Sequence, residues 1–378
     1  MIQLARNRRI ALFMPTLHCG GAERSMVNLL HGMAGANVPL DLILVRAKGP
    51  LLAEVPPQVR VIDLRASQMR YGIWRLANYL RRERPHAVLS RMNYANLAAI
   101  AARQLARVNV RIVVVEASNA SAQAAERRQH RLIEPLMRLL YPRADAIVAV
   151  SDGVAQDLRS RLGLARQRVQ VIYNPVADRV GRLADASQSV HPWLHDGSIP
   201  VFLSVGRLAA VKDFSTLIQA FAMVLRTRPA RLLILGEGDE RGRLESLRDA
   251  LGIGDHVAMP GYSSNPYPSM RRAAAYVLSS RYEGLPNALI EALVCGCPVV
   301  STRCPSGPAE ILADGTYGHL VPLGDVPALA AAMHSAVEHN WNRELLRRRG
   351  CEFSLSHALP RYLEALDYPH SGPGAEAA

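Results

Sequence analysis

The sequence predicts an α/β fold with two doubly wound domains that face each other across a cleft. The chain has 378 residues, about twice the length of a typical domain. Short β-branched apolar runs alternate with helical patterns in both halves, which is typical of βαβ units and parallel sheets. Residues 174–198 break this alternation with Pro, Gly, Ser and Asp, as a linker between domains does.

The predicted elements form two series, one on each side of the linker. Strands of the first series are expected at Ile10–Met14, Leu40–Val45, Val59–Leu64, His86–Leu89, Arg111–Val115, Ala146–Val150 and Val169–Ile172. Helices are expected between them, at Glu23–Met33, Ile73–Arg84, Ala95–Ala106 and Ala124–Leu140. Strands of the second series are expected at Val201–Val205, Leu232–Leu235, His256–Met259, Ala275–Ser279 and Pro298–Ser301. The predicted division is 1–175, a linker at 176–198, 199–354, and a last helix with a frayed tail in 355–378.

Charge is distributed unevenly along the chain. Residues 1–180 carry 27 Lys+Arg and 12 Asp+Glu, a balance of +15, whereas residues 181–378 carry 18 and 20, a balance of −2. Clustered positive charge attracts anionic surfaces. Five cysteines at irregular spacing argue against a secreted disulfide framework, and no run approaches the ~20 apolar residues that span a bilayer. We therefore expect a soluble or peripheral protein in a reducing cytoplasm.

The most informative segment reads SRYEGLPNALIEALVCG, at 280–296. It predicts a strand end, a glycine turn and a helix with Pro286 near its first position. That helix is apolar nearly all round, so Glu291 is a carboxylate on a buried helix and needs a hydrogen-bonding partner. Glu283 lies just before the helix, and eight residues of helical rise would separate it from Glu291 by roughly 12 Å, beyond the ~5–9.5 Å of paired glycosidase carboxylates. This spacing suits two hydroxyl-bearing ends of one ligand, with a phosphate at the helix N-terminus between them; a buried Glu paired to an Arg is the alternative.

Two cations and two glycine turns follow other predicted strands. Arg207 and Lys212, in SVGRLAAVKDF, could clamp a diphosphate and stabilise the charge that develops as it leaves; ordinary surface cations are the alternative. LGEGDE marks a tight strand-to-helix turn. In LHCGGAER, Gly20 and Gly21 let the backbone approach a phosphate or sugar closely, and a plain turn is the alternative reading.

Together these segments resemble glycosyltransferase family 4 over most of residues 9–350. The resemblance rests on GGAER, on VGRL with Lys212 five residues after Arg207, on LGEGDE, on the E-x7-E pair and on CPSGPAEIL at 304–312. It implies a GT-B fold of two Rossmann-like domains, the first for the acceptor and the second for a nucleotide-sugar donor, with a last helix that crosses back to the first. It also implies retaining, metal-independent transfer. CPSGPAEIL, with IYNPV at 172–176, is most similar to members that use UDP-sugars to build bacterial surface or lipid-linked glycans.

The same resemblance implies roles for individual residues. Arg207 and Lys212 would hold the diphosphate and form the catalytic set with Glu283, which would lie near the donor sugar. Glu291 would contact the ribose, and Gly20 and Gly21 would shape the floor beneath the donor phosphate. The turn before the buried helix would complete donor binding with Gly284, Leu285, Pro286 and Asn287. Relatives place a His or similar residue after the fifth strand, whereas this chain reads EASN; candidates for sugar contact are therefore Ser118, Asn119 and His18.

No metal or cofactor is expected. Cys295, Cys297 and Cys304 have no Cys/His set at zinc spacing nearby and are predicted to be small buried hydrophobes. No Asp-x-Asp stands at a predicted strand end, which agrees with metal-free chemistry.

The partners expected besides the donor are a glycan or polyprenyl-linked acceptor and an anionic membrane. Basic amphipathic patterns at 70–82 and 126–141 carry aromatics and fit a peripheral position on the inner face of the plasma membrane; solvated helix faces are the alternative. Nucleic acid is not expected, because no recognised binding module is present.

Three other functions stay open. A nucleotide-sugar epimerase would share the fold. A degenerate transferase could act as a scaffold for an active partner. A dehydrogenase is disfavoured, because neither half has a full GxGxxG with an acidic residue ~20 positions on.

Overall fold

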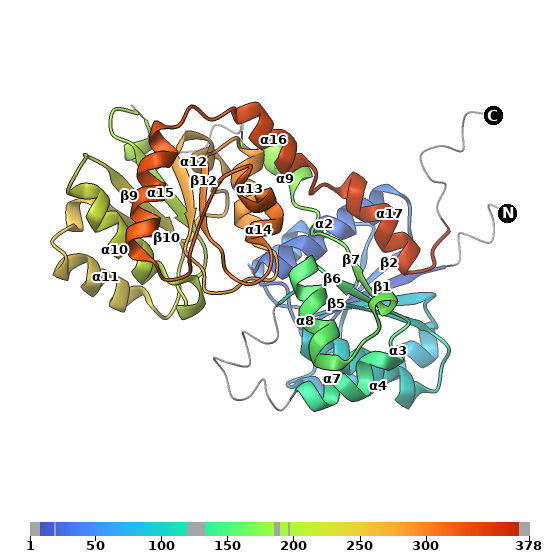
Figure 1. The fold of residues 1–378 in the computed structure, drawn as a ribbon. Coiled ribbons are helices and arrows are strands. Elements are labelled where there is room, and N and C mark those ends of the chain that lie inside the picture. The colour runs from blue at the N-terminus through green and yellow to red at the C-terminus, as the bar shows by residue number, and fades with distance from the viewer. Residues whose placement is uncertain (1–7, 19, 119–132, 185–189, 196, 370–378) are drawn as a thin grey trace, which may run out of the picture. The chain divides into compact units, whose positions relative to one another are not determined.

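The structure, a computed structural model of the chain, describes residues 8–18, 20–118, 133–184, 190–195 and 197–369. The chain divides into two compact units (Figure 1). The first unit comprises Met1–Pro175 and Leu355–Ala378, and the second comprises Val176–Ser354.

The first unit is built on a seven-stranded parallel sheet in the order β3-β2-β1-β4-β5-β6-β7. Its strands are β1 Ile10–Met14, β2 Leu40–Leu44, β3 Arg60–Asp63, β4 Ala87–Arg91, β5 Arg111–Glu116, β6 Ala146–Ala149 and β7 Val169–Val171. Its helices are α2 Gly21–Gly35, α3 Met69–Glu83, α4 Asn93–Ala106, α7 Glu134–Leu140, α8 Asp152–Leu162 and α17 Leu355–Ala365. Helices cover the sheet, so a central strand such as β1 (IALFM) is buried throughout and reads as a continuous apolar run.

The last described helix, α17, belongs to the first unit although it ends the chain. It packs against α2. Its C-terminal end is fixed by the Arg111 Nε, which donates to the Ala365 carbonyl at 2.8 Å, and by the His86 Nε2, which lies 2.8 Å from the Asp367 carbonyl. Tyr362 on this helix is buried.

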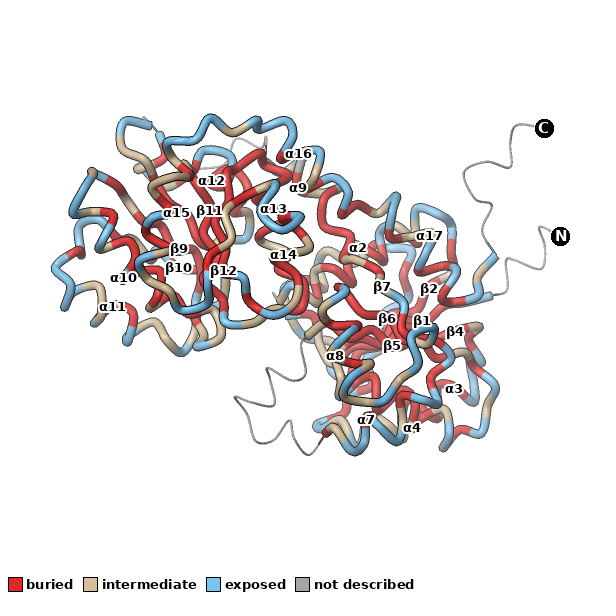
Figure 2. Tube along the Cα trace, viewed as in Figure 1, coloured by how far each residue is buried: buried red, intermediate tan, exposed pale blue. Residues whose placement is uncertain are grey.

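The second unit is built on a six-stranded parallel sheet in the order β10-β9-β8-β11-β12-β13. Its strands are β8 Val201–Val205, β9 Arg231–Leu235, β10 Val257–Gly261, β11 Ala275–Leu278, β12 Val299–Thr302 and β13 His319–Val321. Its helices are α9 Ala177–Ala184, α10 Phe214–Leu225, α11 Arg241–Ala250, α12 Tyr267–Arg272, α13 Asn287–Val294, α14 Pro308–Ile311, α15 Val326–Glu338 and α16 Arg343–Cys351. Figure 2 shows buried strands at the centre of each unit and exposed segments outside them.

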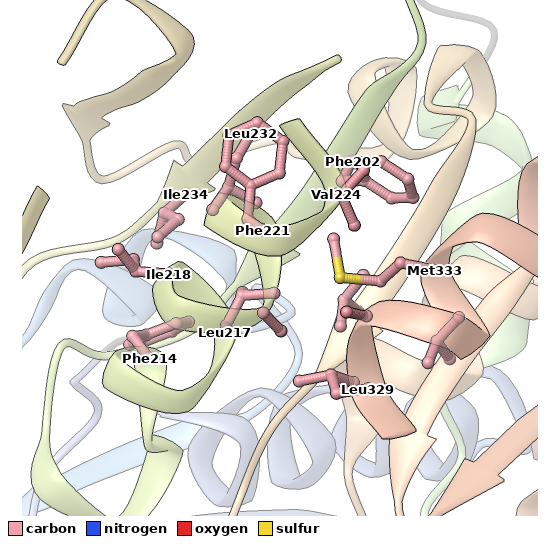
Figure 3. Packing of buried hydrophobic residues seen from close by; sticks show 14 of the residues in the cluster. Phe202, Phe214, Leu217, Ile218, Phe221, Val224, Leu232, Ile234, Leu329 and Met333 are labelled. Carbon is pink, nitrogen blue, oxygen red and sulfur yellow. The ribbon is translucent and has the colours of Figure 1, made fainter. Parts of the chain in front are cut away.

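The main core of the second unit lies between the sheet and helices α10 and α15 (Figure 3). Phe202 of β8 and Phe221 of α10 meet edge to face, with ring centroids 6.3 Å apart. Leu329 and Met333 of α15 are fully buried beside them. Since each such side chain contributes roughly 1.5–3 kcal/mol on burial, this layer fixes the sheet on which the site stands.

The α/β fold class with parallel sheets is confirmed, and three elements differ from the sequence-based expectation. Strand β13 was not predicted, because three residues are too few to show a strand pattern. The segment predicted as a linker contains α9, whose Val180 is buried, and the Val176 and Ala177 amides donate to the Phe353 carbonyl. This segment is therefore held by the second unit. The helix predicted over Ala124–Leu140 is described only from Glu134, because residues 119–132 lie outside the described part.

In the described part of the chain, no helix combines the length and the apolar character needed to cross a bilayer.

Candidate functional site

Each sheet has one point where its strand order reverses, and in doubly wound sheets ligands bind beside the carboxyl ends of the strands at that point. In the second unit the reversal lies between neighbouring strands β8 and β11. The loop after β8 carries Arg207 and Lys212, and the loop after β11 carries Glu283. The predicted catalytic residues therefore stand on the two loops where this fold places a ligand.

Lys212 and Glu283, which are 71 residues apart in sequence, form the centre of this site. The Lys212 Nζ donates to the Glu283 Oε1 at 2.5 Å, and the side chains are 23% and 13% exposed. The Ser280 Oγ donates to the same oxygen at 2.7 Å. Arg207 is exposed and makes no side-chain hydrogen bond or ion pair within the described part of the chain. Of the two predicted cations, Lys212 is thus paired, whereas Arg207 has no side-chain partner among the described residues.

Hydrogen bonds to backbone carbonyls hold the Lys212 loop against the loop after β11. The Ser279 Oγ donates to the Lys212 carbonyl at 2.8 Å, and the Arg281 amide donates to the Val211 carbonyl at 2.8 Å. Asp213, directly after Lys212, has a left-handed backbone with φ +46° and caps α10. Strained non-glycine residues of this kind cluster at functional sites. The sequence alone did not reveal this strain, because it is a property of the backbone.

The sequence predicted only a tight strand-to-helix turn at LGEGDE. In the structure this turn also contacts the loop after β8. A Cβ on Gly236 would lie 1.9 Å from the Gly206 carbonyl oxygen, and a Cβ on Gly238 would lie 2.3 Å from the Leu208 carbonyl oxygen. The Leu208 amide also donates to the Glu237 carbonyl at 2.9 Å. Only glycine fits this backbone contact, so the turn supports the loop that carries Arg207.

Glu291 lies on α13 and is buried, as its apolar helix predicted. The Tyr267 hydroxyl donates to its Oε1 at 3.4 Å, so a neutral phenol is among its partners. Pro286 caps the helix, Asn287 begins it, and the preceding Gly284 and Leu285 are buried. The predicted donor-binding turn thus forms a packed connection between the two acids.

In the first unit, the predicted residues lie on loops after β1 and β5. Gly20 precedes α2 and Gly21 is its first residue, while His18 is exposed. The Ser118 Oγ donates to the Glu116 Oε1 at 3.2 Å. Asn119 lies outside the described residues.

The first unit also contains a buried charge cluster that the sequence did not reveal. Arg91 ends β4 and is 3% exposed; its Nη1 donates to the Ser25 Oγ at 3.1 Å and its Nη2 to the Asn174 Oδ1 at 2.8 Å. Burial lowers the pKa of Arg91, and the nearby charges of Glu23 and Glu116 oppose that change. The predicted strand stopped at Leu89, two residues short, and a polar residue just after an apolar run was the available signal.

Glu116 is the second buried ionisable residue at this edge. It ends β5, is 1% exposed, and its Oε2 accepts from the Tyr141 hydroxyl at 2.9 Å. Burial raises the pKa of Glu116, although the hydrogen bonds from Tyr141 and Ser118 oppose the shift. The residue predicted to contact sugar, Ser118, is thus attached to a buried acid.

The three clustered cysteines are buried, as predicted. Burial raises the pKa of Cys297 and of Cys304 to about 12, so both are protonated thiols near neutral pH. Within the described ranges, no group of three or more His, Cys, Asp and Glu side chains is arranged to hold a metal ion.

Two family models match consecutive parts of the chain. The model described as Glycosyltransferase Family 4 matches residues 19–179, and the model described as Glycosyl transferases group 1 matches residues 188–352.

Two curated relatives show the extent of the similarity. The chain is 28% identical over 361 residues to the N-acetylgalactosamine-N,N'-diacetylbacillosaminyl-diphospho-undecaprenol 4-alpha-N-acetylgalactosaminyltransferase of Campylobacter jejuni, covering 90% of this chain and 93% of that one. It is 34% identical over 235 residues to the lipopolysaccharide core biosynthesis glycosyltransferase LpsE of Rhizobium meliloti, covering 61% and 66%.

Two solved structures share the fold. The lipopolysaccharide outer core galactosyltransferase WaaB superposes with a TM-score of 0.73 at 21% identity, over 95% of this chain and 99% of that one. Anabaena HepE in complex with UDP-glucose superposes with a TM-score of 0.77 at 17% identity, over 96% and 100%. The predicted GT-B fold is confirmed.

Proposed function

Since this chain belongs to glycosyltransferase family 4 and is an enzyme of the hexosyltransferase type, we propose that it transfers a sugar from a UDP-sugar with retention and without a divalent metal. We assign donor binding to the second unit and acceptor binding to the first. The observation that carries the proposal is the pairing of Lys212 with Glu283 at the reversal between β8 and β11.

The proposed chemistry follows from the charges at this site. Lys212 and Arg207 stabilise the negative charge that grows on the leaving diphosphate, which is the task a divalent cation performs elsewhere. The acceptor hydroxyl attacks from the face on which the diphosphate leaves, and a donor phosphate oxygen takes its proton. Glu283 accepts a hydrogen bond from a hydroxyl of the transferred sugar. Glu291, on the buried helix, accepts hydrogen bonds from the ribose hydroxyls.

The choice of donor and acceptor is supported by the relatives. HepE is described in complex with UDP-glucose, and the Campylobacter jejuni relative is named for a diphospho-undecaprenol acceptor. We therefore propose a UDP-sugar donor and a glycan or polyprenyl-linked acceptor in bacterial surface glycan synthesis.

Calorimetric titration of UDP, GDP and ADP, with EDTA present, tests the donor site. We expect UDP to bind at least tenfold more tightly than GDP or ADP, and Lys212→Ala to weaken UDP binding about tenfold, or ~1.4 kcal/mol. Arg226→Ala is the matched control, because it removes an exposed cation at the far end of α10, the helix that follows Lys212. Binding of UDP that is unaffected by Lys212→Ala, or no binding of any nucleotide at millimolar concentration, contradicts the proposal.

We further propose that the first unit docks on an anionic membrane, in a peripheral cytoplasmic position. On α3, Tyr71 and Trp74 are 50% and 62% exposed beside the exposed Arg75. On α7, Leu136 and Leu139 are 49% and 57% exposed. Both helices pack against α4, and basic residues outnumber acidic ones in this half. Exposed apolar side chains beside arginines are typical of helices at an anionic lipid surface.

Vesicle sedimentation tests the membrane proposal. We expect binding to vesicles with phosphatidylglycerol and little binding to pure phosphatidylcholine vesicles. The double variant Trp74→Ser, Leu139→Ser should reduce the bound fraction severalfold. Met223→Ser is the matched control, an exposed apolar residue on α10 of the second unit. Equal loss in both variants, or equal binding to both kinds of vesicle, contradicts docking through this surface.

A further inference from the structure

The two carboxylate oxygens of Glu283 have different environments. Its Oε1 accepts two hydrogen bonds, from the Lys212 Nζ at 2.5 Å and from the Ser280 Oγ at 2.7 Å. Its Oε2 has no donor among the residues that the structure describes. The side chain is 13% exposed. The protein therefore satisfies the hydrogen-bonding capacity of Oε1 and leaves Oε2 available to a ligand.

The hydroxyl that helps to fill Oε1 is itself rigidly placed. Ser280 follows β11 and is fully buried. Its backbone carbonyl accepts a hydrogen bond from the Thr302 Oγ1 at 2.7 Å, and Thr302 is fully buried at the end of the neighbouring strand β12. Two strands thus fix the position of Ser280, and a hydroxyl that donates to a carboxylate forms a short, strong hydrogen bond.

The preceding serine has a separate task. The Ser279 Oγ donates to the Lys212 carbonyl at 2.8 Å and so fixes the backbone of the cation. Ser280 fixes the carboxylate to which that cation is paired. Rotation of the Glu283 carboxylate would break the bonds to both Lys212 and Ser280, so the free oxygen keeps a single direction.

We propose that Ser280 is a positioning residue that, together with Lys212, holds Oε1 of Glu283. Only Oε2 is then available to accept a hydrogen bond from a hydroxyl of the transferred sugar. The inference rests on the proposed function and adds to it a residue that affects recognition of the sugar by positioning Glu283. Ser280 does not contact the substrate. UDP lacks the transferred sugar, so its affinity does not depend on Ser280, whereas the affinity of a UDP-sugar does.

Calorimetry with UDP and with UDP-sugars provides the test. The wild-type protein is first titrated with UDP, UDP-glucose, UDP-galactose, UDP-N-acetylglucosamine and UDP-N-acetylgalactosamine, and the tightest UDP-sugar is kept. In Ser280→Ala we expect UDP affinity to stay within twofold, the preference for the UDP-sugar over UDP to fall about tenfold, and turnover to fall at least tenfold. Thr302→Val, which releases the Ser280 carbonyl, should reduce the same preference by a smaller factor.

Ser204→Ala is the matched control. The Ser204 side chain is also buried in the same sheet, and its Oγ donates to the Val277 carbonyl at 2.7 Å rather than to Glu283. It should lower the unfolding temperature about as much as Ser280→Ala and leave both affinities unchanged. A double variant sharpens the test: if Ser280 acts through Glu283, then Ser280→Ala adds nothing to the loss of preference caused by Glu283→Gln.

Three results overturn the inference. The first is equal loss of UDP and UDP-sugar affinity in Ser280→Ala, which indicates a general structural role. The second is an unchanged preference in both Ser280→Ala and Thr302→Val. The third is a wild-type protein that binds UDP as tightly as every UDP-sugar tested, so that nothing is read at Glu283. Failure of UDP itself to bind is a different result, because it removes the proposed donor site as well.

Discussion

The two sheets reverse their strand order in the same way, and each carries a cation near that point. The two cations differ in how deeply they are buried. In the first unit the reversal lies between β1 and β4, and β4 ends in Arg91, which is 3% exposed near Glu23 and Glu116. In the second unit the corresponding place holds Lys212, which is 23% exposed and paired with Glu283. A buried charge must be satisfied by the protein itself, because water does not reach it. A partly exposed pair such as Lys212 and Glu283 contributes less to stability than a fully buried one, so its members can accept a ligand.

This comparison predicts that charges in the first unit serve stability and charges in the second serve activity. The largest expected effect is that of Arg91→Met. Loss of the buried guanidinium removes its positive charge from beside Glu23 and Glu116, and it removes the hydrogen bonds that Arg91 donates to Ser25 and Asn174. We expect the free energy of unfolding in urea to fall by about 3 kcal/mol. Arg82→Met, at an exposed position on α3, should change it by less than ~0.5 kcal/mol. A loss below ~1 kcal/mol in Arg91→Met would break the comparison.

The next largest effect is the converse, in the second unit. Lys212→Ala should lower the rate of sugar transfer about 100-fold, or ~2.7 kcal/mol, because a cation opposite the leaving diphosphate is lost. The free energy of unfolding should change by less than ~1 kcal/mol, since the ion pair with Glu283 is partly exposed. The transfer assay and a urea titration on the same preparation decide the point. Equal losses in both would make Lys212 a structural residue like Arg91.

A smaller effect is expected from the strained backbone beside Lys212. Asp213 has φ +46°, and its Oδ2 accepts from the Thr216 Oγ1 at 2.9 Å. Both Asp213→Gly and Asp213→Ala remove the carboxylate, but only glycine adopts this backbone without strain. The glycine variant should therefore unfold with a free energy about 1 kcal/mol higher than the alanine variant. If the two variants are equally stable, the loop has another conformation in solution.

The smallest effect concerns pH. Burial raises the pKa of Glu116 above its ordinary value of 4.5, so the folded protein binds a proton more tightly there than the unfolded chain does. Stability contributed by this protonated acid is complete below the unfolded pKa and is lost as the pH rises toward the folded pKa. Glu116→Gln lacks this titration. The stability of the variant relative to the wild type should rise as the pH increases above 4.5 toward the raised pKa of Glu116 in the folded protein. A difference that stays constant across this window contradicts the predicted shift.

Asp41, at the start of β2 in the same sheet, has a pKa that is shifted in the opposite direction to that of Glu116. Burial alone would raise its pKa, but hydrogen bonds from Arg60 and Tyr79 and the charge of Arg9 together hold the pKa of Asp41 below 3.8. Its contribution to stability is present above the unfolded pKa and is lost as the pH falls through the folded pKa. Asp41→Asn should therefore lose its destabilising effect only in strong acid, which distinguishes it from Glu116→Gln.

The fold could be predicted because its strands are buried on both faces and read as apolar runs such as VFLSV and RLLIL. The sequence also placed Lys212 and Glu283 after such runs in a doubly wound sheet, but it did not predict the ion pair between them. The burial of Arg91 and Glu116 could not be predicted, because it depends on side chains from distant elements, including Asn174 and Tyr141; their positions just after apolar runs were the only signal. Ser280 gave no signal either. Its importance depends on which oxygen of Glu283 its hydroxyl reaches, and spacing does not encode that.

The contact of the Gly236–Gly238 turn with the loop after β8 has a consequence for native-state dynamics. The Leu208 amide donates to the Glu237 carbonyl, and the Glu240 amide donates to the Leu208 carbonyl. Neither loop can open without breaking the hydrogen bonds of the other, so both should exchange their amide hydrogens with solvent as one cooperative unit. The segment that carries Arg207 is then no independently fluctuating lid. We expect its backbone to have the local stability of the strands below it, so that the position from which Arg207 extends is fixed before a donor arrives.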